Sequence, residues 1–241
     1  MMGVRVDQVR FAEAMDLIGE YIQEGTTHQI VTLGVEMAML AYRDPELRRI
    51  LRNADLVTPD SIGVVWGARN LGSRLPERVC GVDILGEVAR VSVERKWPFF
   101  LLGGAPGVAE KAVEKLRERW GDILPAGAHH GYFQNPEQPI SVITQAAPKI
   151  LFVGLGVPMQ ENWIARYKDQ LGVPVLIGVG GSFDVISGRL SRAPSWMIKL
   201  GIEWLYRLIQ EPGRAKRMLV LPHFALKILW HKWGRSLRRI S

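Results

Sequence analysis

Asp60 lies just past the short apolar run at residues 55–58, and its position suits two different roles. A carboxylate just past a buried strand can act as a general base and take the proton from an attacking hydroxyl. Aspartate directly before a helix is also a preferred N-cap, because it accepts hydrogen bonds from the N–H groups of the first turn. The position alone favours neither interpretation.

Three predicted strands end in glycine-containing turns, at residues 103–107, 154–158 and 178–182. Glycine lets the backbone turn tightly, and the helix that follows points N–H groups at an anion. The turns together predict a diphosphate cradle formed by Gly103, Gly104, Gly156, Gly180, Gly181 and Ser182. Glycine also occurs in such turns for steric reasons alone. No turn has the pattern of a dinucleotide fingerprint or a P-loop, which leaves a nucleoside diphosphate carrying another group.

Three further polar residues, Thr32, Gln160 and Asp184, lie near the ends of predicted strands. Thr32 and Gln160 suit contacts with a sugar, and Asp184 suits a hydrogen bond to a ribose or a base edge. Each residue also suits a simple role in ending or capping an element. Their expected convergence at one edge of a sheet makes them candidates for a binding site.

Metal chemistry finds no support in the motifs of the chain. D-x-D, H-E-x-x-H and C-x-x-C patterns are absent, and the side chains of adjacent His129 and His130 diverge. We therefore expect neither a metal nor another cofactor. The charge on a departing diphosphate then requires arginines and helix N-termini. The candidate arginines are Arg78, Arg207, Arg214 and Arg217. Cys80, the one cysteine, lacks a partner base and is interpreted as a structural thiol.

Short apolar runs repeatedly lead into amphipathic stretches, which is typical of βα units around a parallel sheet. The predicted strand and helix pairs are 28–32 with 35–43, 55–58 with 61–70, 99–102 with 107–120, 150–153 with 160–168, and 175–179 with 183–187. The sequence therefore predicts an α/β fold with an open, mostly parallel sheet and helices on both faces. In such sheets ligands bind beyond the carboxyl ends of the strands.

All of the excess positive charge lies in the last part of the chain. The formal net charge is +7, yet residues 1–188 hold 19 Lys/Arg and 22 Asp/Glu, whereas residues 189–241 hold 12 Lys/Arg and 2 Asp/Glu. Four of the eight tryptophans also lie in residues 189–241. Tryptophan beside basic residues favours an anionic lipid surface. Nucleic acid is disfavoured, because apolar stripes interrupt the basic residues.

Two amphipathic helices with basic polar faces are predicted over residues 195–210 and 216–235. We accordingly divide the chain into an α/β catalytic domain, 1–188, and a helical membrane-binding appendage, 189–241. The alternative is that these helices pack on the core and their charges face water. The chain has no apolar stretch of spanning length and no evident secretory signal. We expect a cytoplasmic protein, peripheral on the inner face of the cell membrane, and homo-oligomerisation stays open.

The ordered motifs of the chain resemble those of the WecG/TagA/CpsF glycosyltransferases of bacterial cell-surface polymer synthesis. The resemblance rests on residues 31–32 (VT), 36–37 (EM), 58–63 (TPDSIG), 77–79 (ERV) with Gly81 and Asp83, and 100–104 (FLLGG). It continues through residues 130–133 (HGYF), 154–161 (GLGVPMQE), 178–184 (GVGGSFD), 192–194 (RAP) and 203–208 (EWLYRL). So many ordered matches are far more specific than any single glycine turn.

This resemblance implies a Rossmann-like, inverting, metal-independent transferase. TagA-like members, the closest in character, move N-acetylmannosamine from its UDP form to N-acetylglucosaminyl-diphospho-undecaprenol during synthesis of the wall teichoic acid linkage unit. By analogy Asp60 is the base, and Thr32, Gln160 and Arg78 belong to the catalytic site. Tyr132 joins the substrate-binding residues, and the arginine-bearing appendage closes over the diphosphate.

One position departs from the family pattern. Gly34 stands where the family usually has asparagine, so a sugar or acceptor contact is absent or is supplied elsewhere. Transfer of another UDP-sugar, such as UDP-N-acetylmannosaminuronate or UDP-glucose, is the alternative within the same fold. A non-catalytic, nucleotide-binding membrane scaffold is the alternative from a different class.

Overall fold

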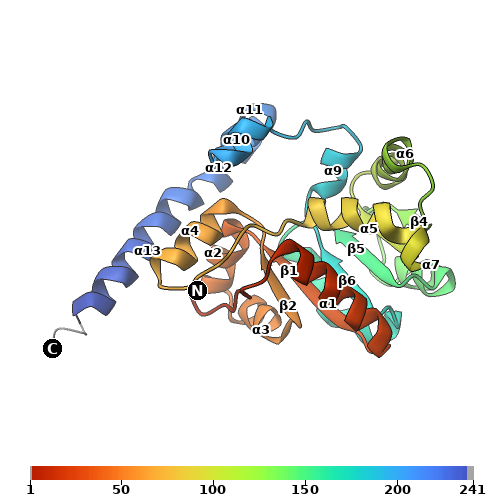
Figure 1. Cartoon of the computed structure of the whole chain (residues 1–241), viewed down its shortest axis with the longest axis horizontal. Helices are drawn as coiled ribbons and strands as arrows, with labels where there is room; N and C mark the ends of the chain where they lie inside the picture. Colours follow the sequence, from red (N-terminus) through yellow and green to blue (C-terminus); the bar gives the residue numbers. More distant parts are fainter. Residues whose placement is uncertain (1, 238–241) are drawn as a thin grey trace.

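A single open sheet forms the centre of the molecule (Figure 1). The computed structural model describes residues 2–237, apart from the side chains of residues 199, 214, 216, 217 and 234–237. Within that range six strands, each parallel to its neighbours, lie in the order β2-β1-β6-β5-β3-β4. They are β1 (His28–Leu33), β2 (Leu56–Pro59), β3 (Phe99–Gly103), β4 (Pro125–His129), β5 (Ile150–Gly154) and β6 (Val175–Gly178). The predicted Rossmann-like α/β sheet is confirmed.

Helices cover both faces of the sheet (Figure 1). Those of the α/β part are α1 (Phe11–Glu24), α2 (Val35–Arg43), α3 (Pro45–Asn53), α4 (Ile62–Asn70), α5 (Gly81–Arg95), α6 (Val108–Trp120), α7 (Gln138–Ala146), α8 (Met159–Leu171) and α9 (Ser182–Ile186). Side chains alternate along each strand, so Phe99 and Leu101 join the core beneath α1, α5 and α6, whereas Phe100 and Leu102 join the core beneath α8. The strands, and with them the edge of the sheet at their carboxyl ends, are thereby held between two apolar layers.

The five predicted strand and helix pairs are all observed, with ends that differ by at most a few residues. Strand β4 was not predicted. Its sequence, Pro-Ala-Gly-Ala-His, has no run of large apolar side chains, and each of its residues is only partly buried at the edge of the sheet. Pairing with β3 therefore defines this strand, rather than its own hydrophobic pattern.

The predicted single helix over residues 195–210 is wrong. Two helices, α10 (Ser195–Lys199) and α11 (Glu203–Gln210), are separated by Gly201 in the left-handed region (φ 73°). A side chain at Gly201 would lie 3.0 Å from Ile62, so the close approach of this turn to α4 also favours glycine. A 3₁₀ turn (Pro212–Arg214), α12 (Ala215–Met218) and α13 (Val220–Leu237) complete the segment.

Helix α13 packs on the core through one face. Phe224 and Ile228 are 2% and 0% exposed and join the cluster that contains Val31 and Leu33 of β1. The sequence left open that the C-terminal helices pack on the core, and this is what one face of α13 does. The division of the chain at residue 188 stays a prediction. None of the helices within residues 2–237 combines the length and apolar character needed to cross a membrane.

Candidate active site

Asp60 lies at the carboxyl end of β2 and is held by two neighbouring elements. Its N–H donates to the carbonyl of Leu33 at the end of β1 (3.0 Å), and its Oδ1 accepts from the N–H of Gly81, the first residue of α5 (3.0 Å). Its Oδ2 has no hydrogen-bond partner among the described residues. The N-cap of the following helix, α4, is Ser61, whose hydroxyl accepts from Val64. The interpretation of Asp60 as the cap of that helix is therefore wrong.

The surroundings of Asp60 favour a carboxyl group that holds its proton more tightly than usual. Burial raises the pKa of Asp60, while the Gly81 N–H and the positive charges of Arg207 and Arg78 lower it in part. The net direction is upward, although the residue keeps some exposed surface. Such a carboxyl group suits proton transfer near neutral pH, because a base works best when its pKa lies near the working pH.

An ion-pair network connects α11 to the strand edge beside Asp60. Arg78 Nη1 contacts Glu203 Oε2 at 2.6 Å, and Arg207 Nη2 lies 3.6 Å from the other oxygen of Glu203. Burial raises the pKa of Glu203, but the hydrogen bond and charge of Arg78 and the charge of Arg207 outweigh it, so the net shift is downward. Glu203 therefore stays ionised and holds two guanidinium groups whose charges act on the carboxyl group of Asp60.

A second ion pair fixes the same segment. Arg192, in the connection before α10, contacts Asp83 of α5 at 2.7 Å. Helix α5 thus supplies the N–H that binds Asp60 and a carboxylate that holds the C-terminal segment. The side chains of Arg214 and Arg217 lie outside the described residues, and their predicted contact with a diphosphate stays a prediction.

Thr32 and Gln160 meet at Gly178, the last residue of β6. The Thr32 hydroxyl donates to the Gly178 carbonyl (2.7 Å), and a side chain added at Gly178 would lie 2.7 Å from Gln160 Nε2. Thr32 also lies against Gly81, whose added Cβ would be 3.3 Å from the threonine oxygen. Asp60, Thr32 and Gln160 are therefore connected through Gly81 and Gly178 at the ends of the adjacent strands β2, β1 and β6. Gln160 and Thr32 are themselves 1% and 7% exposed.

The three glycine turns lie side by side, because β6, β5 and β3 are neighbours. Gly104 donates its N–H to the carbonyl of Gly154 (3.1 Å), and Gly103 packs directly on the Gly154 backbone. Close packing of the turns thus accounts for these glycines without a ligand. Gly156 and Gly180 differ, since both have left-handed φ angles, 80° and 53°, and face open space. These two turns are the better candidates for contact with a diphosphate.

The remaining predicted binding residues lie at the margins of this edge. Ser182 donates its hydroxyl to the Val179 carbonyl (2.6 Å), and Asp184 is paired with Arg189 at 3.3 Å. Tyr132 follows β4, two strands beyond β5, and is 73% exposed. The structure does not bring Tyr132 into contact with Asp60 or Thr32.

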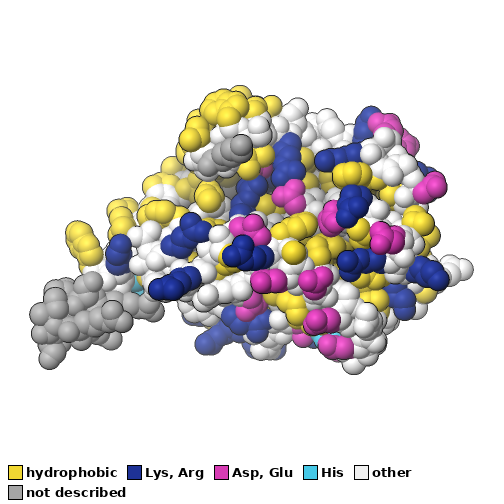
Figure 2. Space-filling model, in the orientation of Figure 1, with side chains coloured by type: hydrophobic (Ala, Val, Ile, Leu, Met, Phe, Trp, Pro, Cys, Tyr) yellow, Lys and Arg dark blue, Asp and Glu magenta, His cyan; other side chains and the backbone are white. Residues whose placement is uncertain are grey.

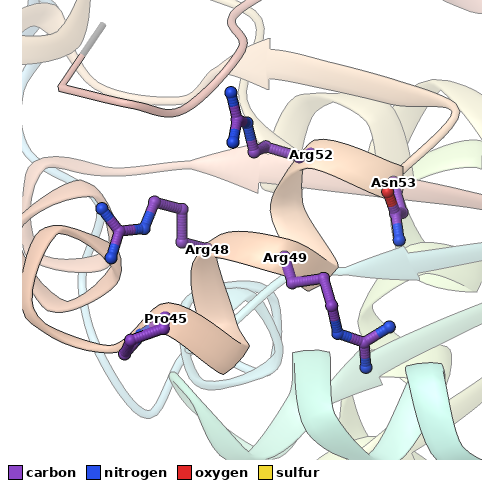
Figure 3. Close-up of a pocket in the computed structure, with 5 residues that line it drawn as sticks. All are labelled: Pro45, Arg48, Arg49, Arg52 and Asn53. Atoms are coloured by element: carbon purple, nitrogen blue, oxygen red, sulfur yellow. The ribbon is translucent and has the colours of Figure 1, made fainter.

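The hollow over α3 is not part of this site. It encloses about 330 Å³ and is lined by Pro45, Arg48, Arg49, Arg52 and Asn53. The three guanidinium groups point in different directions (Figure 3), and Arg49 is paired with Glu46 at 2.6 Å. Helix α3 leads into the amino end of β2, so this hollow lies away from the strand edge that carries Asp60.

Neither a metal site nor a reactive thiol accompanies the described part of the edge. No group of three or more His, Cys, Asp or Glu side chains among the described residues is arranged to hold a metal ion. Cys80 is buried and donates to the Asp60 carbonyl at 3.4 Å. Burial and the nearby Asp60 carboxylate raise the pKa of this thiol, so it stays protonated, as expected of a structural cysteine.

Comparison with known proteins agrees with this geometry. The model described as the glycosyl transferase WecG/TagA/CpsF family matches residues 1–238. The chain belongs to the WecG/TagA/CpsF family of glycosyltransferases.

Relatives in this family share long aligned regions with the chain, and the three described next carry the name N-acetylglucosaminyldiphosphoundecaprenol N-acetyl-beta-D-mannosaminyltransferase. The protein of Bacillus subtilis strain 168 is 40% identical over 87% of this chain and 82% of its own length. That of Bacillus spizizenii is 34% identical over 88% and 82%, and that of Staphylococcus aureus strain MW2 is 31% identical over 95% and 91%.

The sequence did not predict two acidic residues of this WecG/TagA/CpsF protein as site residues. Glu203 is one of two acidic residues in a strongly basic segment, a contrast that could have indicated a specific partner. Glu161 follows Gln160 and is fully buried. At Gly34, the departure from the family pattern, a Cβ would have no atom of another element within 4 Å, so contact with the Cβ does not explain the glycine.

Proposed function

We propose that this glycosyltransferase moves N-acetylmannosamine from its UDP form to N-acetylglucosaminyl-diphospho-undecaprenol, with Asp60 as the base. The names of the relatives described above support this choice of acceptor and of transferred sugar. The observation that carries the residue assignment is the position of Asp60 at the carboxyl edge of the sheet. There its Oδ2 has no hydrogen-bond partner among the described residues, and the charges of Arg78, Arg207 and Glu203 act on its carboxyl group.

The proposed step is a single displacement. The acceptor hydroxyl oxygen attacks C1 of the donor sugar and forms the new glycosidic bond, while the bond from C1 to the diphosphate oxygen breaks. The hydroxyl proton passes to Asp60, and UDP leaves with the bonding electron pair. The attack occurs on the face opposite the leaving group, so the configuration at C1 inverts.

Arginines provide the charge that the leaving UDP requires in this proposal. Fixed cationic groups at the position of developing negative charge stabilise a transition state, because they need no reorganisation as the bond breaks. Arg78 and Arg207 are held in place by Glu203 before any substrate arrives. We therefore expect transfer to continue in the presence of a chelator, with no dependence on added divalent cations.

Exposed apolar side chains on the C-terminal helices support the choice of a lipid-linked acceptor. Large apolar side chains stand exposed on α10, α11, α13 and the turns between them (Figure 2). We call this set the C-terminal apolar surface: Trp196, Leu200, Trp204, Ile209, Leu219, Leu226, Trp230 and Trp233, each between 41% and 73% exposed. Burial of such side chains in the headgroup layer, next to basic residues, stabilises a protein that lies on a bilayer.

The double variant W230A/W233A should weaken binding to vesicles that contain anionic lipid by about tenfold or more, because two large aromatic groups no longer enter the interface. Sedimentation with vesicles measures the loss. The matched control is Trp120→Ala, since Trp120 is an exposed tryptophan on α6, outside the C-terminal apolar surface. Equal binding by the double variant and the wild type would contradict a membrane contact at these residues.

Release of UDP tests the proposed reaction directly. Purified protein with UDP-N-acetylmannosamine and a short-chain N-acetylglucosaminyl-diphospho-lipid should release UDP only when both substrates are present. UDP-N-acetylmannosaminuronate and UDP-glucose serve as competing donors, and faster transfer from either would replace the proposed sugar. A nucleotide-binding scaffold would bind UDP without releasing it from any donor.

A further inference from the structure

Glu161 is a buried carboxyl group that forms no ion pair within the described residues. It is the third residue of α8 and is 0% exposed. Burial raises its pKa to about 7, although the hydrogen bond from Gln160 lowers it in part. Its Oε2 has no hydrogen-bond partner among the described residues. A buried, incompletely paired carboxyl group destabilises a fold relative to an apolar side chain of similar size, so stability does not explain its presence.

The glycine at the end of β6 makes room for Glu161 and Gln160. A Cβ at Gly178 would lie 2.7 Å from Gln160 Nε2 and 3.0 Å from Glu161 Oε1. Both side chains are buried, so any larger residue at Gly178 would displace these two atoms. The two side chains therefore pack directly against the backbone that leads into the turn at Gly180 and Gly181.

A chain of hydrogen bonds passes through these side chains to that turn. Glu161 Oε1 accepts from Gln160 Nε2 at 2.8 Å, and Gln160 Oε1 accepts from the N–H of Gly180 at 3.0 Å. An N–H group can bind only the oxygen end of an amide, and a carboxyl oxygen without a proton can bind only its NH₂ end. Glu161 thus determines which end of the Gln160 amide faces the turn.

The turn held by Gln160 is one of the two that face open space. Gly180 has a φ of 53°, and a Cβ added there would meet no atom within 4 Å, in contrast to one added at Gly103. The carbonyl side of Gly180 packs against Gly154. Thr32 of β1 donates its hydroxyl to the Gly178 carbonyl at 2.7 Å, just before the same turn. Side chains from β1 and α8 therefore both hold the backbone at this turn.

We propose that Glu161 is a positioning residue, which orients the Gln160 amide and so holds the Gly180–Gly181 turn in the conformation that receives the diphosphate of the donor. The assignment of a diphosphate to this turn depends on the proposed function. The hydrogen bonds that hold the turn do not depend on it. Glu161 touches no substrate in this arrangement and acts through Gln160. A neutral side chain with an acceptor oxygen at the same place should serve equally well.

Three variants separate this role from simple packing. Glu161→Gln keeps an acceptor for the Gln160 amide, and Glu161→Leu removes it at similar volume. Ile164→Ala is the matched control, because Ile164 is a buried residue of the same helix (1% exposed) whose truncation weakens packing without removing a hydrogen bond. Hydrogen exchange of the Gly180 amide is measured in the free protein, and UDP affinity is measured by calorimetry.

Glu161→Leu should raise the exchange rate of the Gly180 amide by about tenfold or more, since this N–H loses its ordered acceptor. It should also weaken UDP binding by about tenfold, whereas Glu161→Gln stays within about threefold of the wild type in both measurements. Ile164→Ala should lower Tm and leave both quantities near those of the wild type.

Unchanged Gly180 exchange in Glu161→Leu would overturn the proposal. An equal rise in Ile164→Ala would also overturn it, because general loosening of α8 would then explain the effect. An equal rise in exchange and an equal loss of UDP affinity in Glu161→Gln would also overturn it, since the glutamine introduced at position 161 still provides an acceptor oxygen for Gln160. Failure of the wild type to transfer any sugar would instead refute the proposed function and leave the exchange result to decide the role of Glu161.

Discussion

Asp60→Asn should lower kcat for sugar transfer by about 10²- to 10⁴-fold, which is the usual contribution of a positioned general base. In the wild type the N–H of Gly81 lies 3.0 Å from Asp60 Oδ1. Asparagine keeps an oxygen that can accept this hydrogen bond, so the local fold should persist. It cannot take a proton from the acceptor hydroxyl. UDP affinity should therefore stay close to that of the wild type, and the loss should appear in kcat.

The stability of this variant supplies an internal check. The pKa of Asp60 is raised in the folded state, so the folded protein holds this proton more tightly than the unfolded chain does. The free energy of unfolding contributed by Asp60 consequently falls as the pH rises from the ordinary carboxyl pKa through the raised one. Asp60→Asn removes that penalty, and its Tm at neutral pH should equal or exceed that of the wild type.

The same raised pKa predicts the acid side of the pH profile. Only the ionised carboxylate can accept the proton, so kcat/KM should fall as the pH drops through the raised pKa of Asp60, above the range of an ordinary carboxyl group. A matched control is Asp55→Asn, because Asp55 precedes the same strand and binds the N–H of Gln29 at 2.7 Å. Full transfer by Asp60→Asn, with intact UDP binding, would remove Asp60 from the role of base.

Arg78→Ala should lower kcat/KM by about 10²- to 10³-fold, because a fixed positive charge next to the leaving diphosphate is lost. It should also lower the free energy of unfolding by about 1–3 kcal/mol, since Glu203 loses its closer partner. The side chains of this pair are 18% and 17% exposed, so solvent weakens the effect below that of a fully buried pair. Arg207, 3.6 Å from Glu203, should retain part of the attraction.

A double variant separates the two losses. Arg78→Ala combined with Glu203→Gln leaves no unpaired carboxylate, so stability should recover toward that of the wild type while transfer stays low. Arg90→Ala is the control for an exposed pair, since Arg90 contacts Glu87 at 2.6 Å within one helix and should change stability by less than about 0.5 kcal/mol. Recovery of transfer in the double variant would show that the loss in Arg78→Ala came from the unpaired Glu203 carboxylate and not from the missing positive charge.

Local patterns were sufficient to predict where most functional residues lie. The apolar runs of β1, β2 and β6 predicted parallel strands, and the carboxyl ends of parallel strands share one edge. Thr32, Asp60 and the turn at Gly180 had to lie at that edge once the strands were correctly identified. The basic, tryptophan-rich composition of residues 189–241 likewise required no knowledge of the fold. The exposed apolar side chains of this segment agree with its tryptophan-rich composition.

Tertiary structure alone decided which partners these residues have. Asp60 binds the N-terminus of α5 rather than that of the helix that follows it, because β2 ends beside α5 in the folded sheet. Glu203 reaches Arg78 across 125 positions of the chain, from a helix, α11, that the break at Gly201 separates from α10. Spacing along a sequence encodes the period of a helix or a strand. It does not encode which distant elements meet, since that depends on strand order and on the packing of both faces.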